Sequence, residues 1–384
     1  MIKFPFHLIL GFVLLTGLAF AGGEEIPPPP DVIPTAAPTE TPSPYHYRIP
    51  EKTPDGWPVA DLRRDKADVK KISREMDRVS RLPWAAIHSL LVFHHGKLVL
   101  EEYYGGYGRD SAQALFSCTK SVFSTVFGIA RDQGLLDPGQ KLYDLYPEER
   151  SKPGWEPGKD GITLGHLLSM TSGLGCDDVG LGSENCGSRM TDAPDWLAFC
   201  FVLPLAHPVG TVWTYNGSCL ALIARQIALK SGMSFPDFAQ KYLLGPLGIQ
   251  GNDWIKGPKG VDRVDYGLHW KARDMGKLGQ LYLDRGMWKG KRILSEDWVK
   301  EATSPHSPLG QAFGETYGYL WYIKDTWWKG KPVVIFNARG YEGQMILVAP
   351  DADLVCVITA GSADDRIYGM EMDLFERTIL NGFY

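Results

Sequence analysis

The chain has 384 residues, of which 44% are hydrophobic and 22% are charged, and its formal net charge at neutral pH is -5. These values are typical of soluble globular proteins with one large domain or two smaller ones. The modest negative charge and the lack of a basic stripe argue against nucleic-acid binding, so we expect no nucleic-acid partner. Composition alone does not predict an oligomeric state.

The first 21 residues have the features of an export signal. Lys3 supplies a positive charge, residues 7–20 are almost entirely apolar, and Ala19-Phe20-Ala21 fits a signal-peptidase site. We predict cleavage after Ala21, and an uncleaved membrane anchor is the alternative. The apolar stretch is short for a membrane span. The mature protein is therefore expected to be secreted or periplasmic, without stable membrane insertion.

Residues 22–60 are rich in proline and are predicted to form a disordered linker. The folded domain is predicted over residues 61–384, and it opens with a helix at about 66–79. Two apolar runs flank His94-His95-Gly96-Lys97, a pattern that indicates a β-hairpin.

The remaining pattern predicts helices in the middle of the chain and strands near its end. Helical spacing occurs at residues 117–132, 162–171, 218–231 and 271–286. Short apolar runs predict strands at 317–324, 332–337, 344–349 and 354–360, followed by a helix at about 367–380. We therefore predict an α+β fold. Its antiparallel sheet is built from about 61–117 and 300–384 and flanked by helices, with a mostly helical region at about 118–299.

Six cysteines would enter an oxidising compartment if the chain is exported. Cys176 and Cys186 flank a loop rich in glycine, aspartate and asparagine, and they are the predicted disulfide pair. Cys200 is left undecided. Three others lie in apolar patterns and are expected to be buried free thiols: Cys118, Cys219 and Cys356. The chain has no C-x-x-C pair and no H-E-x-x-H motif, so no metal site is predicted.

Ser117-Cys118-Thr119-Lys120 places a hydroxyl and an amine three residues apart at the start of a predicted helix. Residues with this spacing share one helical face. An amine whose pKa is lowered by burial can take the serine proton and so create a nucleophile. The alternative is a serine that caps the helix beside a solvated lysine. No other S-x-x-K pattern occurs in the chain.

Five segments in order resemble those of a known family: residues 116–121, 162–174, 208–217, 273–282 and 340–348. From about residue 70 to its end, the chain resembles the penicillin-recognising serine hydrolases, in which S-x-x-K carries the nucleophile. The similarity is to the branch that holds class C β-lactamases, related esterases and 6-aminohexanoate-dimer hydrolases. This resemblance implies a β-lactamase/transpeptidase-like fold.

The resemblance also implies roles for particular residues. Ser117 would be the acylated nucleophile, Lys120 its base or proton relay, and Tyr215 the tyrosine that passes a proton to the leaving group. For that task the pKa of Tyr215 must fall well below about 10, and we expect Lys120 to lower it. The backbone N–H groups of Ser117 and Tyr341 are the expected oxyanion donors.

The sequence departs from the family pattern at two places. Gly217 stands where many relatives have asparagine, and the adjacent Asn216 is expected to point elsewhere. The third family motif, Lys-Thr-Gly, reads Ala338-Arg339-Gly340 here. Arg339 is a candidate for supplying charge to the substrate, although alternation along a strand can turn it away. Gly340 is a candidate for close substrate approach, and Gly217 completes the predicted substrate-binding set.

Other nucleophile systems have less support. The chain contains no G-x-S-x-G elbow. His166, His207 and His269 are available for a Ser-His-Asp triad. However, His166 lies in an apolar helical pattern and is expected to be a core residue, and His207 precedes a Pro-Gly turn.

The sequence thus predicts an exported serine hydrolase that cleaves a small ester, amide or peptide through an acyl-enzyme on Ser117, with no metal or cofactor. The missing third-motif lysine favours activity like that of an esterase or a 6-aminohexanoate-dimer hydrolase. A β-lactamase or D-Ala-D-Ala carboxypeptidase is the alternative. A non-catalytic ligand-binding relative is a second one.

Overall fold

The computed structural model describes residues 44–82, 86–179, 185–308, 314–364 and 366–384. The predicted signal peptide, residues 1–21, and the first part of the predicted linker, residues 22–43, lie outside this range. Within the described ranges, no helix is both long enough and apolar enough to cross a membrane.

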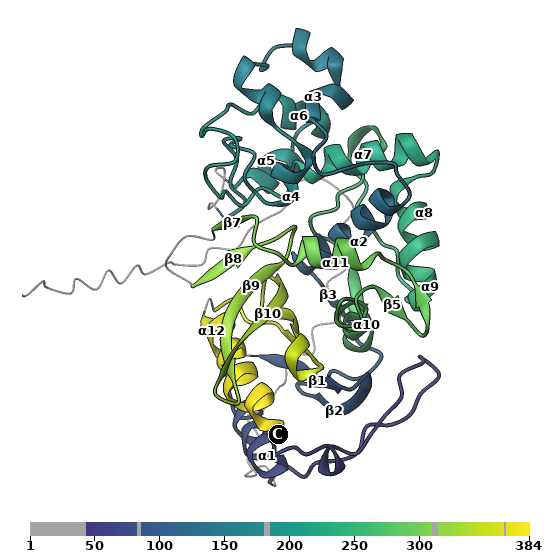
Figure 1. Cartoon of the computed structure of the whole chain (residues 1–384), viewed down its shortest axis with the longest axis vertical. Coiled ribbons are helices and arrows are strands. Elements are labelled where there is room, and N and C mark those ends of the chain that lie inside the picture. The colour runs from purple at the N-terminus through teal and green to yellow at the C-terminus, as the bar shows by residue number, and fades with distance from the viewer. Residues whose placement is uncertain (1–43, 83–85, 180–184, 309–313, 365) are drawn as a thin grey trace, which may run out of the picture. The chain divides into compact units, whose positions relative to one another are not determined.

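The main sheet has eight strands in the order β2-β1-β12-β11-β10-β9-β8-β7, and neighbouring strands are antiparallel (Figure 1). It joins strands from both ends of the chain, which confirms the predicted fold class. The strand bounds are β1 Ile87–His94, β2 Lys97–Tyr103, β7 Ser307–Pro308, β8 Glu315–Tyr317, β9 Tyr322–Trp328, β10 Lys331–Gly340, β11 Gln344–Ala349 and β12 Leu354–Ala360.

Helices cover both faces of this sheet. Alternate residues of β1 enter two separate hydrophobic clusters, because successive side chains of a strand point to opposite faces. Leu91 joins the cluster of α2 (Cys118–Asp132) and α10 (Ala272–Leu283), whereas Leu90 joins the cluster of α1 (Val69–Val79) and α12 (Arg366–Asp373). Helix α2 is buried from residue 118 to residue 130, so the predicted nucleophile motif opens a core helix.

In chain order the remaining helices lie between β2 and β7, as predicted, and most of them gather above the sheet in Figure 1. The prediction missed two small sheets within or bordering this region. In one, β3 (Ala112–Ala114) pairs with β4 (His269–Lys271), and in the other β5 (Met287–Trp288) pairs with β6 (Lys291–Arg292). The helix bounds are α3 Leu142–Leu145, α4 Leu164–Leu168, α5 Cys186–Thr191, α6 Trp196–Val202, α7 Leu220–Ser231, α8 Phe235–Ala239, α9 Gly245–Leu247 and α11 Glu296–Ala302.

The predicted strand at 317–324 is wrong in one respect, because the structure divides it into β8 and β9. The residues between the two strands bond outside the sheet: the N–H of Tyr319 donates to the carbonyl of Ala302, and that of Leu320 to the carbonyl of Leu168. Leu320 also has a positive φ of 65°. An apolar run therefore looked continuous although its backbone turns. The predicted C-terminal helix likewise changes from α12 to a π-helix at Leu374–Ile379.

The prediction of a disordered linker is wrong for residues 45–60. Trp57 is only 2% exposed, and its indole N–H donates to the carbonyl of Arg273 at 3.0 Å. The hydroxyl of Tyr47 donates to the carbonyl of Val99, and Val59 forms a β-bridge with Leu98. The compact unit accordingly begins at Tyr45. Aromatic anchors between the prolines give this extended segment enough apolar surface to pack.

Two of the six cysteines lie close together, and the other four are buried. The Cα atoms of Cys176 and Cys186 lie 5.2 Å apart, within the range that a disulfide needs. The expectation of buried free thiols is confirmed for the three cysteines in apolar patterns, and the undecided one joins them: Cys118, Cys219, Cys356 and Cys200.

Candidate active site

The candidate nucleophile lies on a sharp turn between β3 and α2. The N–H of Leu115 donates to the carbonyl of Leu268, and the next residue, Phe116, has a left-handed φ of 45°. Such a conformation is strained for a bulky residue and is often found at functional sites. The side chain of Ser117 makes no capping hydrogen bond to α2. The alternative of a simple helix cap is therefore wrong.

Lys120 is the residue that contacts the serine hydroxyl. Its side chain is buried, and Nζ donates to Ser117 Oγ and to the carbonyl of Asp265, each at 3.0 Å. Within the part of the chain that the structure describes, Lys120 forms no ion pair. Burial lowers the pKa of Lys120, although the carboxylates of Asp265 and Asp178 act against this shift. The amine is therefore placed, and its pKa shifted, as a general base requires.

Tyr215 lies at the same site, but its electrostatics differ from the prediction. Lys120 Nζ is 4.7 Å from the centroid of the phenol ring, so the amine lies over the ring face. Burial raises the pKa of Tyr215 well above 10, and the neighbouring Tyr322 and Tyr317 add to this. A hydrogen bond with Ser117 lowers this pKa by less. The expectation that Lys120 lowers the pKa of Tyr215 is thus wrong, because the net shift of this pKa is upward.

The end of β10 lies beside the nucleophile turn. The ring centroids of Phe116 and Tyr341 are 5.6 Å apart. Neither the backbone N–H of Ser117 nor that of Tyr341 donates a hydrogen bond to another described residue. A Cβ on Gly340 would lie 2.1 Å from the carbonyl oxygen of Leu115. The close approach that the structure shows at Gly340 is therefore made by the protein's own backbone, just before the turn that carries Ser117.

Arg339 is engaged within the protein. Its guanidinium forms an ion pair with Glu315 at 2.5 Å and donates to Asn337 Oδ1 at 2.7 Å. It also lies 4.5 Å from the ring centroid of Tyr322. The structure thus does not support the expectation that Arg339 supplies charge to a substrate. Ala338, at the place of the family lysine, is buried and carries no charge.

Gly217 allows a close packing arrangement around Lys120. A Cβ at this position would lie 2.4 Å from Lys120 Cε and 2.9 Å from Nζ, so any side chain here would displace the amine. Its backbone N–H donates to Asp178 Oδ2 at 2.6 Å. Gly217 therefore packs against the candidate base, whereas the sequence suggested contact with substrate. Asn216 Oδ1 accepts from the N–H of Cys219 at the start of α7, pointing away as expected.

A group of charged residues behind Lys120 was missed by sequence analysis. Asp265 is bound by Arg263 at 2.9 Å, and both side chains are buried. Asp178 lies next to this pair and belongs to the loop between Cys176 and Cys186. The only sequence signal was the closely spaced charged pattern Asp262-Arg263-Val264-Asp265.

None of the three histidines considered for a triad contacts Ser117. His166 is half-buried and accepts the N–H of Thr163 at Nδ1, so it caps α4; the expectation of a core histidine is wrong. His269 pairs with Asp253 at 3.0 Å, and His207 is exposed. No histidine among the described residues hydrogen-bonds to Ser117.

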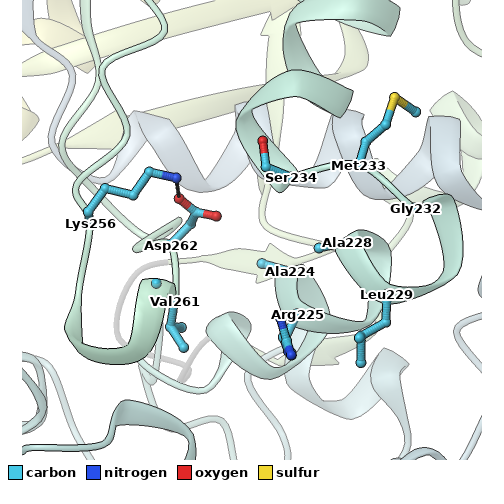
Figure 2. Close-up of a pocket in the computed structure, with 11 residues that line it drawn as sticks. Ala224, Arg225, Ala228, Leu229, Gly232, Met233, Ser234, Lys256, Val261 and Asp262 are labelled. Carbon is cyan, nitrogen blue, oxygen red and sulfur yellow. Dashed lines mark hydrogen bonds and ion pairs between the residues drawn. The ribbon is translucent and has the colours of Figure 1, made fainter.

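One surface hollow is lined by none of the residues that contact Ser117. It has a volume of about 380 Å³ and lies between the end of α7, the start of α8 and the segment around Lys256 and Asp262, which form an ion pair (Figure 2). Its lining includes none of Ser117, Lys120 and Tyr215. The contacts of Ser117 therefore define the candidate site, and this hollow does not.

Comparisons with known proteins agree with this geometry. The family model described as Beta-lactamase matches residues 82–366. A 6-aminohexanoate-dimer hydrolase of Paenarthrobacter ureafaciens is 24% identical over 306 residues, which cover 74% of this chain and 75% of that protein.

Two solved structures show the same fold. An octameric penicillin-binding protein homologue from Pyrococcus abyssi has a TM-score of 0.60 at 20% identity, covering 80% of this chain and 77% of that one. A penicillin-binding protein homologue from Caulobacter crescentus has a TM-score of 0.61 at 16% identity, covering 76% and 91%. Since the family model spans well over half of the sequence, the chain belongs to the beta-lactamase family.

Proposed function

We propose that this protein is a serine hydrolase that cleaves an ester or small amide bond through an acyl-enzyme on Ser117. The observation that carries the proposal is the 3.0 Å contact between Lys120 Nζ and Ser117 Oγ in a buried setting. A buried amine with a lowered pKa and no ion-pair partner among the described residues can accept the serine proton more readily than a solvated lysine can.

The reaction would proceed by two acyl transfers. Ser117 Oγ gives its proton to Lys120 and bonds to the substrate carbonyl carbon, whose oxygen becomes an oxyanion bound by the N–H groups of Ser117 and Tyr341. Tyr215 donates a proton to the leaving alcohol or amine, the bond to that group breaks, and Lys120 restores the tyrosine proton. Water then gives a proton to Lys120 and attacks the acyl carbon, the bond from that carbon to Ser117 Oγ breaks, and Ser117 takes the proton back from Lys120 as the acid leaves. Each oxyanion donor would contribute about 10²–10³-fold in rate.

The charge of the cleft favours one class of substrate. The family lysine is absent, and Arg339 already has Glu315 and Asn337 as partners. Positions 338 and 339 of this strand therefore offer no free cation for a carboxylate close to the scissile bond. Esters and linear amides without such a carboxylate fit better than penicillins or D-Ala-D-Ala peptides, which carry one. The relative that acts, by its name, on the 6-aminohexanoate dimer agrees with an amide substrate.

We further propose that the protein works in the periplasm or outside the cell. Support comes from the signal-like residues 1–21 and from the 5.2 Å spacing of the Cys176 and Cys186 Cα atoms, which suits a disulfide.

Covalent labelling tests the proposed chemistry. The mature protein is treated with a fluorophosphonate and with a penicillin, and adducts are mapped by mass spectrometry, with Ser117→Ala as the matched control. We expect a fluorophosphonate adduct on Ser117 that is absent from the control. A folded sample with no adduct from either reagent would support a non-catalytic binding protein instead.

A substrate panel then sorts the activities. Short-chain esters and linear amide dimers are expected to turn over faster than a chromogenic cephalosporin or a D-Ala-D-Ala peptide. The reverse order would favour a β-lactamase or carboxypeptidase.

A further inference from the structure

Both the backbone and the side chain of Asp178 form hydrogen bonds with the loop that carries Tyr215. Its backbone N–H donates to the carbonyl of Tyr215 at 2.8 Å. Its side chain accepts from the N–H of Gly217 at 2.6 Å and from the hydroxyl of Ser218 at 3.3 Å. One residue from a different loop therefore fixes the backbone on both sides of Asn216, directly after the candidate proton donor.

Asp178 also places a carboxylate near Lys120, and no cation among the described residues is bound to this carboxylate. The groups that act on the Lys120 amine are the carboxylates of Asp265 and Asp178, the guanidinium of Arg263, the thiol of Cys118 and the ring of Tyr215. Arg263 is ion-paired with Asp265, which balances that carboxylate. Asp178 forms no ion pair with any residue that the structure describes. Its charge is therefore the one left to balance a protonated Lys120.

The contacts of Asp178 lie at Gly217, the position where many relatives have asparagine. Gly217 has no side chain, and Lys120 fills the space beside it. The polar group that reaches this backbone comes instead from Asp178. Burial raises the pKa of Asp178, and the nearby ammonium of Lys120 opposes this rise, so the charges on the two groups depend on each other.

We propose that Asp178 is a positioning residue for the acyl transfer inferred above: it fixes the Tyr215 loop, and its negative charge stabilises the ammonium that Lys120 becomes when it takes the proton of Ser117. The inference rests on the proposed function. It assigns two separable roles to one side chain, a hydrogen-bond acceptor for Gly217 and a counter-charge for Lys120. Variants can remove them one at a time.

The test compares Asp178→Asn with Asp178→Ala in the full mature protein, using an uncharged ester. Asparagine keeps an acceptor for the Gly217 N–H but removes the charge. Loss of a negative charge near Lys120 disfavours its protonated form, so the acid limb of kcat/KM should move to lower pH by about one unit. Alanine removes both roles, so it should show the same shift and also lose about a hundredfold in kcat as the Tyr215 loop relaxes.

Asp177→Asn is the matched control, because it removes the same charge from the neighbouring exposed residue and should leave the acid limb in place. An unmoved acid limb in Asp178→Asn would overturn the counter-charge role. Equal kcat in the alanine and asparagine variants would overturn the positioning role. Fluorophosphonate labelling of Ser117 in the wild type separates these failures from a failure of the proposed function, and the asparagine variant remains informative if the alanine variant does not fold.

Discussion

Two basic side chains of the candidate site, Lys120 on helix α2 and Arg339 on strand β10, have opposite environments. Lys120 is buried, and its amine is held by a hydroxyl and a backbone carbonyl. Arg339 is held by the carboxylate of Glu315 and the amide oxygen of Asn337. Burial without a bound anion lowers the pKa of an amine, whereas an ion pair keeps a basic group charged. The candidate site thus contains one amine suited to accept a proton and one cation held by its partners.

The same contrast extends to the surrounding segments. On the helix side, Ser117, Lys120 and Tyr215 keep the family's residue types, and the rest of the chain supplies new charged neighbours. On the strand side, the family lysine is lost and the replacement arginine is neutralised. The proposal of acyl transfer therefore rests on Ser117, Lys120 and Tyr215. The changes at Ala338 and Arg339 concern the choice of substrate.

The largest effect is expected from Lys120→Met, which keeps an apolar side chain of similar length but removes the base. We expect kcat to fall at least about a thousandfold, because the Ser117 hydroxyl would no longer have a proton acceptor. The measurement is steady-state ester hydrolysis on a sample shown to be folded by circular dichroism. Lys277→Met is the matched control: Lys277 is equally buried but is ion-paired with Asp274 at 2.7 Å, so its loss should change stability more than kcat. Turnover by Lys120→Met within tenfold of wild type would contradict the assignment.

Tyr215→Phe tests the proton donor on the same side. The ring contacts with Trp213 and Lys120 would remain, but kcat should fall by about a hundredfold or more, because the leaving group would lose its acid. Since burial raises the pKa of Tyr215, its phenol stays protonated up to high pH. The wild type should therefore show no loss of kcat/KM from tyrosinate formation below about pH 10. A basic limb near pH 8 that disappears in Tyr215→Phe would show that this pKa is lowered instead.

Replacing Cys176 and Cys186 by serine tests the loop that carries Asp178. The two cysteines are 10 residues apart, and opening a loop of this size should lower the free energy of unfolding by about 3 kcal/mol. The measurement is urea unfolding of the wild type and the double variant. Alkylation of unreduced, denatured wild-type protein should label only the four free cysteines. Labelling of all six would contradict the pairing.

The smallest effect is expected from Glu315→Gln, which would release the charge of Arg339. We expect kcat/KM for substrates with a carboxylate to rise about two- to fivefold, because the freed guanidinium could attract that group. The uncharged ester should be unaffected and serves as the control substrate. An equal change for both substrates would mean that the pair with Glu315 does not govern selection by charge.

Much of the sheet could be predicted from the sequence, because its strands are apolar runs with clear ends. Strands β11 and β12 lie at the predicted residues, where the turn at Pro350–Ala352 separates them. The hairpin around His95 and Gly96 also occurs as predicted. The failures were at 45–60 and 317–324, where composition suggested disorder or continuity. Packing of Trp57 and hydrogen bonds to Ala302 and Leu168 decided those segments instead.

The candidate site also contains residues that the sequence indicated and residues that it did not. Ser117 and Lys120 could be paired from the sequence, because three residues along a helix fix their relative placement, and the family pattern added Tyr215. Asp178, Asp265 and Arg263 gave no comparable signal, because they approach Lys120 from distant segments. The sequence alone therefore determined which groups are the candidates for acyl transfer. Only the tertiary structure decided their electrostatics, because burial raises the pKa of Tyr215 and the pairing of Arg339 with Glu315 depends on strands that meet after folding.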